Sequence, residues 1–313
     1  MVAKFPFLSV IIPTRDRLDL LMRTVAALLT QASDIENQME IVVIDDGSII
    51  DITNPLMNLA ILHNQKNLVR VLHQSPEGPA AARNLGIREA KGEIILFLGD
   101  DILASPGLLR AHLTGHIREY SKSHYAILGM AELAPELQNT PFVRWWKRWN
   151  FRYWLLLEKR RSPDYSFFYT NNLSLKRSFL LQYGSFDETF RYPAYEDSEL
   201  GVRLFKNGLQ LIFMPEAHAE HWHEINLQSA CRRMVTRGKT YDLFVAKTNQ
   251  QGISRIWMIL GTGPWMTPTV IRPLFKLANW LQTKAICSPV YIMVLMYNFQ
   301  VGRGKKSPIN EIA

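Results

Sequence analysis

The sequence predicts an α/β protein built on a mostly parallel sheet with helices on both faces. Short apolar segments alternate with segments of helical spacing through the first hundred residues, which is typical of parallel strands connected by helices. Two of the predicted strands end in paired aspartates, Asp45-Asp46 and Asp100-Asp101. Ligands of such sheets bind at the carboxyl ends of the strands, so these pairs mark the predicted functional edge.

The individual elements follow from periodicity and from turn residues. Residues 8–12 predict a buried strand that Pro13 stops, and apolar residues then recur at helical spacing from Leu18 to Leu29. Ser105-Pro106 predicts a helix start with Ser105 as the N-cap. The same patterns predict strands over residues 40–44, 69–72 and 93–98, and a helix over residues 80–90.

The second half changes in character. Residues 142–168 are rich in aromatic and basic side chains, and a predicted helix over 197–207 and strand over 211–214 follow. Residues 226–247 predict a basic amphipathic helix, and the chain beyond Ser254 is apolar and interrupted by prolines. We therefore expect an α/β domain over residues 1–225 and a helical, apolar appendage over residues 226–313.

The amino-acid composition indicates which classes of molecule the protein is expected to bind. The 313 residues carry a net charge of +8 at pH 7, which favours anionic partners such as nucleotide diphosphates and anionic lipid. No nucleic-acid-binding module is recognisable, so nucleic acid is not an expected partner. Two distant cysteines imply no disulfide framework, and no signal peptide or membrane-spanning segment is predicted. These features favour a cytoplasmic protein.

Three strand ends carry candidate ligand-binding residues. Asp100-Asp101 can hold a hard divalent cation and, through it, a diphosphate, although a solvated turn has the same composition. A carboxylate of Asp45-Asp46-Gly47-Ser48 can accept a hydrogen bond from a uracil-type N–H, and the alternative is a simple turn. Pro13-Thr14-Arg15-Asp16 can receive a base or a phosphate, or can merely cap the next helix.

Further candidates lie at helix starts and after the last predicted strand. Gly78 and Arg83 surround a helix start that favours phosphate, unless Arg83 is an exposed structural residue. Asp197 near a helix N-terminus would stay ionised and could act as a general base, or it is an N-cap. His221 and His223 would share a strand face and could bind a metal, although histidines are more often structural.

Taken in order, these elements resemble the family 2 glycosyltransferases of the GT-A fold over about residues 8–223. The matching motifs are Ser9-Val10-Ile11-Ile12-Pro13-Thr14-Arg15-Asp16, Val43-Ile44-Asp45-Asp46-Gly47-Ser48, Ala82-Arg83-Asn84-Leu85-Gly86, Phe97-Leu98-Gly99-Asp100-Asp101, Asn172-Leu173-Ser174-Leu175, Gly184-Ser185-Phe186-Asp187-Glu188, Tyr195-Glu196-Asp197 and Pro215-Glu216-Ala217-His218-Ala219-Glu220-His221. Each motif is weak alone, and the ordered series is specific.

The resemblance implies roles for individual residues. Asp197 would deprotonate the acceptor, Asp101 and His221 would bind the metal, and Asp100 would lie on the ribose or the metal. The donor nucleotide would be held by Pro13, Thr14, Arg15, Asp45, Asp46 and Arg83. The acceptor-side candidates are Asn172 and Glu196.

Two departures from the family pattern qualify these roles. Gly99 stands where the metal motif often begins with aspartate, which leaves the metal geometry less defined. The Gln-x-x-Arg-Trp motif of processive synthases is absent, and residues 228–234 do not supply it. The resemblance thus implies an inverting enzyme that uses Mg²⁺ or Mn²⁺ to move one sugar from a nucleotide-diphosphate donor to an acceptor hydroxyl.

Two other functions remain open from the sequence, a nucleotidyltransferase and an inert sugar- or lipid-binding protein, and donor hydrolysis with a divalent cation would separate them. Aromatic and basic residues from Trp145 to Trp154, and an apolar tail ending in Arg303, Lys305 and Lys306, suit a membrane interface. The alternative is a helical hairpin packed on the core. We expect peripheral attachment to the anionic inner face of the cell membrane, near a glycan or lipid-linked acceptor.

Overall fold

The computed structural model describes residues 8–35, 37–159, 162–250 and 266–308. These residues form two compact units by their internal contacts. The first unit takes its residues from the ranges 1–132, 156–191 and 196–222, and the second from 133–155, 192–195 and 223–313. The start of the predicted apolar tail, up to residue 265, lies outside the described residues.

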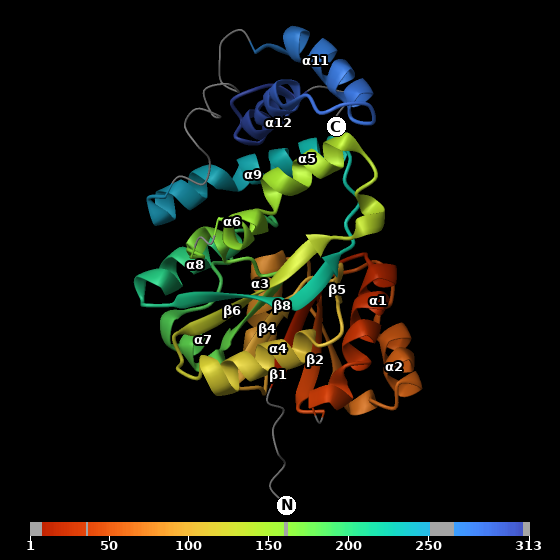
Figure 1. Cartoon of the computed structure of the whole chain (residues 1–313), viewed down its shortest axis with the longest axis vertical. Helices are drawn as coiled ribbons and strands as arrows, with labels where there is room; N and C mark the ends of the chain where they lie inside the picture. Colours follow the sequence, from red (N-terminus) through yellow and green to blue (C-terminus); the bar gives the residue numbers. More distant parts are fainter. Residues whose placement is uncertain (1–7, 36, 160–161, 251–265, 309–313) are drawn as a thin grey trace, which may run out of the picture. The chain divides into compact units, whose positions relative to one another are not determined.

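The first unit is an α/β fold with one eight-stranded sheet in the order β3-β2-β1-β4-β7-β6-β8-β5 (Figure 1). Its strands are β1 Leu8–Thr14, β2 Met39–Asp45, β3 Val69–His73, β4 Ile94–Leu98, β5 Ile102–Ala104, β6 Tyr125–Leu133, β7 Asn172–Lys176 and β8 Gln210–His221. Strands β1 to β4 pair in parallel, whereas β7 pairs antiparallel with β4 and β6. The predicted α/β class is confirmed. Among the described strands, the parallel pairs are those between β1 and β2, β1 and β4, and β2 and β3.

The helices of the first unit lie on both faces of the sheet. They are α1 Leu18–Leu29, α2 Thr53–Leu62, α3 Pro79–Glu89, α4 Leu108–Thr114, α7 Arg177–Tyr183 and α8 Glu196–Lys206. Val10 and Ile41 face a core that contains Leu21 and Val25 of α1. Ile11 faces the opposite way, toward α3, where a Cβ on Gly86 would lie 2.5 Å from its Cγ2 atom. Alternation along each strand thus buries both faces.

Two predicted boundaries differ from the structure. Strand β1 continues through Pro13 to Thr14, because Pro13 pairs with Ile44 of β2 while the pairing with β4 ends at Ile11. Helix α4 begins at Leu108 after Gly107, which has a φ of 89°. Ser105 is therefore not the N-cap, and its hydroxyl lies 2.8 Å from Nδ1 of His218.

The last strand of the sheet is much longer than the predicted segment of residues 211–214. Strand β8 runs from Gln210 to His221 and includes Pro215. Its pairing with β5 involves only the three residues from Ala219 to His221, so Pro215 removes no hydrogen bond from that ladder. The extended strand brings His221 to the level of Ile102, directly after the acidic turn.

The second unit is helical. It contains α5 Pro141–Asn150, α9 Leu227–Thr248, α11 Pro268–Leu281 and α12 Ser288–Gly302, while α6 Tyr153–Leu157 is divided between the units. The predicted basic helix is confirmed as α9, which starts with a capping box at Asn226 and Ser229. Helices α9 and α12 lie side by side with Gly238 against Gly302, where neither backbone leaves room for a Cβ atom (Figure 1).

The aromatic segment divides between buried and accessible side chains. Trp146 of α5 is fully buried, and the ring of Phe142 lies edge-on to Tyr291 of α12 with centroids 5.0 Å apart. These side chains of the aromatic segment pack between helices, which agrees with the alternative of a packed helical hairpin and not with a membrane interface. In the part of the chain that the structure describes, no helix combines the length and apolarity that crossing a membrane requires.

Candidate active site

The acidic turn after β4 carries two buried carboxylates. Asp100 and Asp101 are 7% and 8% exposed and follow Leu98, the last residue of the strand. The hydroxyl of Thr14 donates to Oδ2 of Asp100 over 2.9 Å, and that of Thr24 donates to the Asp100 carbonyl over 3.0 Å. The end of β1 therefore meets the end of β4, as their parallel pairing requires, and Thr14 of β1 and Thr24 of α1 both anchor Asp100.

Gly99 has a steric explanation. A Cβ atom at this position would lie 2.9 Å from Cγ1 of Ile102 and 3.0 Å from Oδ1 of Asp101. An aspartate here would therefore crowd the Ile102 side chain and the Asp101 carboxylate, two residues further on. The glycine leaves room for Asp101 in its observed position, and the departure from the family pattern is compatible with a metal ligand at Asp101.

Arg17, just before α1, joins the two acids. Its Nη1 atom lies 3.0 Å from Oδ1 of Asp100 and 2.9 Å from Oδ2 of Asp101. Burial raises the pKa of Asp100 to about 6, with a further rise from the neighbouring Asp101 charge, while Arg17 and Thr14 act in the opposite direction. Arg17 is not among the site residues predicted from the sequence, although a basic residue directly before a predicted helix, close to the end of the first strand, could have pointed to it.

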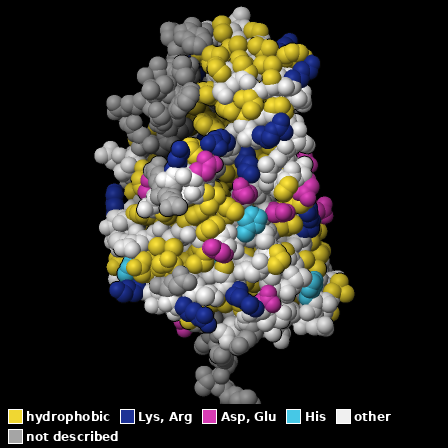
Figure 2. All heavy atoms as spheres, viewed as in Figure 1, with side chains coloured by type: hydrophobic (Ala, Val, Ile, Leu, Met, Phe, Trp, Pro, Cys, Tyr) yellow, Lys and Arg dark blue, Asp and Glu magenta, His cyan; other side chains and the backbone are white. Residues whose placement is uncertain are grey.

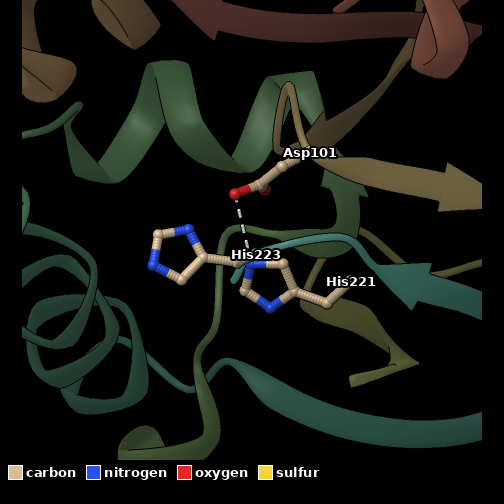
Figure 3. A group of neighbouring side chains, drawn as sticks. All are labelled: Asp101, His221 and His223. Atoms are coloured by element: carbon tan, nitrogen blue, oxygen red, sulfur yellow. Dashed lines mark ion pairs between the residues drawn. The ribbon is translucent and has the colours of Figure 1, made fainter. Parts of the chain in front are cut away.

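Asp101 also belongs to a group that can hold a metal ion. Ligand atoms of Asp101, His221 and His223 all lie within 4.8 Å of one another (Figure 3). Nε2 of His221 lies 3.3 Å from Oδ2 of Asp101. The backbone N–H of Trp222 donates to the Asp101 carbonyl over 2.8 Å, which fixes the end of β8 against the acidic turn. One carboxylate and two imidazoles form a donor set that fits a divalent cation.

The predicted donor-binding residues of β2 lie beside the same edge. Asp46 accepts hydrogen bonds from the backbone N–H groups of Glu77 and Gly78 over 2.8 and 2.9 Å. Asp45 accepts from the Ser48 N–H over 2.9 Å, and its other oxygen lies 3.0 Å from Nδ1 of His73. These two carboxylates hold the loops after β2 and β3 in position.

The residues of the predicted donor-side segment from Pro13 to Asp16 lie in different surroundings in the structure. The Asp46 N–H donates to the Thr14 carbonyl over 3.0 Å, which places the buried Thr14 between the two acid pairs. Pro13 is half-buried in the strand. The side chain of Arg15 is 53% exposed and lies 3.7 Å from Asp16, so Arg17 rather than Arg15 contacts the acidic turn.

Arg83 and Glu196 form a second buried charged pair. Nη1 of Arg83 lies 3.0 Å from Oε1 of Glu196, and Glu196 opens α8. Among the described residues, Nε of Arg83 and Oε2 of Glu196 have no hydrogen-bond partner. Burial raises the pKa of Glu196 to about 7, and the adjacent charge of Asp197 adds to the rise. Each side chain thus retains bonding capacity for a ligand.

Asp197 stands in the first turn of α8, as the sequence predicts. It is half-buried, and its Oδ1 atom accepts from the Ser198 N–H over 2.7 Å. The helix N-terminus stabilises its ionised form. Tyr195, two residues earlier, has a φ of 67°, which is costly for a non-glycine residue and marks a constrained entry into the helix.

Asn172 does not join the other candidates. Its side chain is fully buried, its Nδ2 atom donates to the Ala217 carbonyl over 2.8 Å, and its Oδ1 atom lies 2.9 Å from Nε2 of His112. Ser174 lies 2.8 Å from His112 and 2.9 Å from His116 through its hydroxyl. This placement gives Asn172 a structural role in a buried polar network, since its amide is already satisfied by the protein.

Comparison with known proteins identifies the family. The model of "Glycosyl transferase family 2" matches residues 9–184. Validoxylamine A glucosyltransferase of Streptomyces hygroscopicus subsp. jinggangensis is 28% identical over 279 residues, covering 78% of this chain and 64% of that protein. Chondroitin synthase of Pasteurella multocida is 29% identical over 231 residues, covering 64% of this chain and 23% of that one. The chain thus spans less than two thirds of the length of these relatives.

Solved structures share the fold. The mannosyltransferase PcManGT from Pyrobaculum calidifontis, in complex with GDP-Man and Mn²⁺, has a TM-score of 0.65 at 15% identity, covering 97% of this chain and 87% of that one. GalNAc-T7 with UDP, GalNAc and Mn²⁺ has a TM-score of 0.53 at 17% identity, covering 70% of this chain and 44% of that one. These likenesses show the GT-A fold.

Proposed function

The chain belongs to glycosyltransferase family 2, and from that premise we propose that it moves a single sugar from a nucleotide-diphosphate sugar to an acceptor hydroxyl with inversion at the anomeric carbon. The observation that carries the proposal is the group of Asp101, His221 and His223 beside the buried Asp100, at the carboxyl ends of β1 and β4. Two solved relatives of this fold are bound to Mn²⁺ with a nucleotide or nucleotide sugar, which supports the same donor class.

Asp101, His221 and His223 would hold the divalent cation. Mg²⁺ is bound almost entirely through oxygen, so a site with two imidazoles favours Mn²⁺. The bound cation would stabilise the negative charge that develops on the leaving diphosphate. Asp45, Asp46 and Arg83 surround the same edge, and we assign the nucleotide to them.

Asp197 supplies the proton acceptor in this proposal. Its carboxylate takes the proton of the acceptor hydroxyl as that oxygen forms a bond to the anomeric carbon. The bond between the anomeric carbon and the diphosphate oxygen breaks, and the nucleoside diphosphate leaves with the bonding electrons. Attack on the face opposite the leaving group inverts the anomeric configuration. Glu196, held by Arg83, lies directly before Asp197, and we assign to it the orientation of the acceptor.

We also propose that the second unit attaches to an anionic membrane surface, which suits a lipid-linked acceptor. Helix α11 buries one face through Ile271, Phe275 and Ala278. Four of its other apolar residues, Val270, Pro273, Leu277 and Trp280, recur at helical spacing and are exposed, while Leu274 and Leu281 are half-buried. Figure 2 shows hydrophobic side chains gathered over this helix with basic ones at their margin.

The charges on α11 suit anionic lipid. The helix contains no acidic residue and exposes Arg272 and Lys276. Just beyond it, the Lys284 ammonium lies 4.1 Å from the ring centroid of the half-exposed Trp280. An exposed apolar stripe with a cationic margin is typical of helices that lie in a membrane interface.

The experiment that tests the transferase proposal uses a panel of nucleotide-diphosphate sugars with Mn²⁺, Mg²⁺ or a chelator. We expect one donor to release its nucleoside diphosphate in the presence of Mn²⁺ and to stop doing so with the chelator. A nucleotidyltransferase would instead release pyrophosphate from a nucleoside triphosphate. Absence of metal-dependent release from every donor, with and without added acceptor mixtures, would contradict the proposal.

A further inference from the structure

Arg17 stands where a cation would bind. One nitrogen of its guanidinium, Nη1, contacts both carboxylates of the acidic turn, at 3.0 Å from Asp100 and 2.9 Å from Asp101. The two acids are adjacent and buried, and each raises the cost of ionising the other. Arg17 thus brings a positive charge into contact with both carboxylates in the protein without a bound cation.

The oxygen that Arg17 contacts is also the one nearest to His221. Oδ2 of Asp101 lies 2.9 Å from Nη1 of Arg17 and 3.3 Å from Nε2 of His221. Divalent cations bind carboxylate oxygens at about 2.0–2.6 Å. A cation on this oxygen would therefore lie next to a guanidinium at hydrogen-bond distance from the same atom, and two positive charges would repel each other in a poorly solvated site.

Asp100 and Asp101 have contacts that hold them in place besides those with Arg17. Asp100 keeps its hydrogen bonds from the hydroxyls of Thr14 and Thr24, and Asp101 keeps the bond from the Trp222 N–H to its carbonyl. The Arg17 backbone is anchored, because its carbonyl accepts from the Leu21 N–H over 3.0 Å. Its side chain is 38% exposed, so it can swing toward solvent while the helix stays in place.

We propose that Arg17 and the divalent cation exclude one another at the acidic turn. The guanidinium offsets part of the negative charge of Asp100 and Asp101 when no cation is bound, and it leaves Asp101 when the cation arrives. Arg17 thereby lowers the intrinsic affinity of the site for the metal. This inference rests on the proposed metal dependence and adds to it a residue of the chain that competes with the ion.

The test measures Mn²⁺ binding directly, by electron paramagnetic resonance of free Mn²⁺ during titration of the full chain at pH 8 without donor. Arg17→Gln should bind Mn²⁺ about tenfold more tightly than the native protein, because no charged contact has to be broken first. The rise in melting temperature that Mn²⁺ produces should also be larger in this variant. Arg110→Gln removes a charge from an exposed arginine and should leave the Mn²⁺ affinity unchanged.

The outcomes separate the two proposals. Equal or weaker Mn²⁺ binding by Arg17→Gln, with clear binding by the native protein, overturns the exclusion and leaves the metal site intact. Absence of Mn²⁺ binding in both proteins overturns the metal site and the exclusion together. If Arg17→Gln does not fold, Arg17→Lys replaces it, and an affinity between those expected for native protein and Gln variant supports the proposal, whereas unchanged affinity overturns it.

Discussion

Arg83 of α3 and Glu196 of α8 form an ion pair of 3.0 Å between side chains that are only 11% and 6% exposed. The pair links the start of α8 to the helix that follows Gly78, whose N–H binds Asp46. Arg83 also lies over the ring of Phe186, 5.4 Å from its centroid. Arg83, which we assign to the donor, is therefore in direct contact with Glu196, which we assign to the acceptor side.

Removing one partner of this pair should destabilise the protein strongly. Arg83→Met removes the counter-charge that opposes the rise in the pKa of Glu196, so this buried carboxyl must either stay ionised alone or take up a proton, and we expect a loss of about 1–3 kcal/mol in the free energy of unfolding at pH 7. The double variant Arg83→Met/Glu196→Gln should lose clearly less, because no uncompensated charge remains. Urea unfolding at pH 7 measures both. Equal losses in the single and double variants would contradict a coupled pair.

Asp101→Asn should abolish both Mn²⁺ binding and turnover, since a neutral amide is a poor ligand for a hard cation. Asp101→Ala should fail in the same way. Mn²⁺ titration and nucleoside diphosphate release measure the two effects. Asp51→Asn, at an exposed loop aspartate, is the matched control and should change neither. Full activity of Asp101→Asn at ordinary Mn²⁺ concentrations would remove Asp101 from the metal site.

Asp197→Asn should reduce the rate of transfer and leave donor affinity nearly unchanged. The amide keeps the size and the hydrogen bonding of the side chain but cannot accept the proton. General base catalysis contributes on the order of 100- to 10,000-fold, and we expect a loss of kcat in that range. Steady-state kinetics with a saturating acceptor measures it. A large rise in the donor KM at constant kcat would assign Asp197 to binding.

The buried His112 should make stability fall in acid. Burial lowers the pKa of His112 from 6.5 to about 4. Between these two pH values the imidazole is protonated in the unfolded chain but stays neutral in the folded protein. The contribution of His112 to the free energy of unfolding is fully present above pH 6.5. It falls by up to about 1.4 kcal/mol per pH unit as the pH drops from 6.5 to 4.

The comparison of native protein with His112→Gln isolates this effect. Asp100 and Glu196, whose pKa values are raised by burial, act in the opposite direction but equally in both proteins. Urea unfolding at pH 7, 6 and 5 should show the native protein's advantage over the variant shrinking as the pH falls. A constant difference across this range would mean that His112 is accessible to protons in the folded state.

Helix α11 should mediate binding to anionic vesicles. Flotation with phosphatidylglycerol vesicles at low salt should recover the native protein, and neutral phosphatidylcholine vesicles should recover much less. Leu277→Ser and Trp280→Ser should reduce binding at any salt concentration, whereas Lys276→Gln should reduce it mainly at low salt.

A matched leucine elsewhere provides the control for this surface. Leu181 of α7 is 60% exposed, compared with 43% for Leu277, and Leu181→Ser should leave flotation unchanged. Equal losses for the two leucine variants would mean that vesicle binding does not depend on α11. Absence of native protein from both vesicle types at low salt would show that the exposed stripe of α11 is not a membrane surface.

The sequence by itself determined the local elements and the order of the motifs. Apolar runs ended by acidic pairs predicted β2 and β4, and the turn residues placed Asp46 and Asp101 at the strand ends. The basic amphipathic pattern over residues 226–247 predicted α9. These features depend on neighbours within a few residues, because helix caps and side-chain periodicity are local properties of the backbone.

Only the tertiary structure decided which of these residues meet. Arg17 reaches Asp100 across 83 positions of the chain, and His221 and His223 reach Asp101 because β8 pairs with β5. Asn172, although part of a matching motif, is turned into a buried polar network by the antiparallel pairing of β7 with β4. Such contacts depend on strand order and register, which long-range packing sets and local periodicity does not encode.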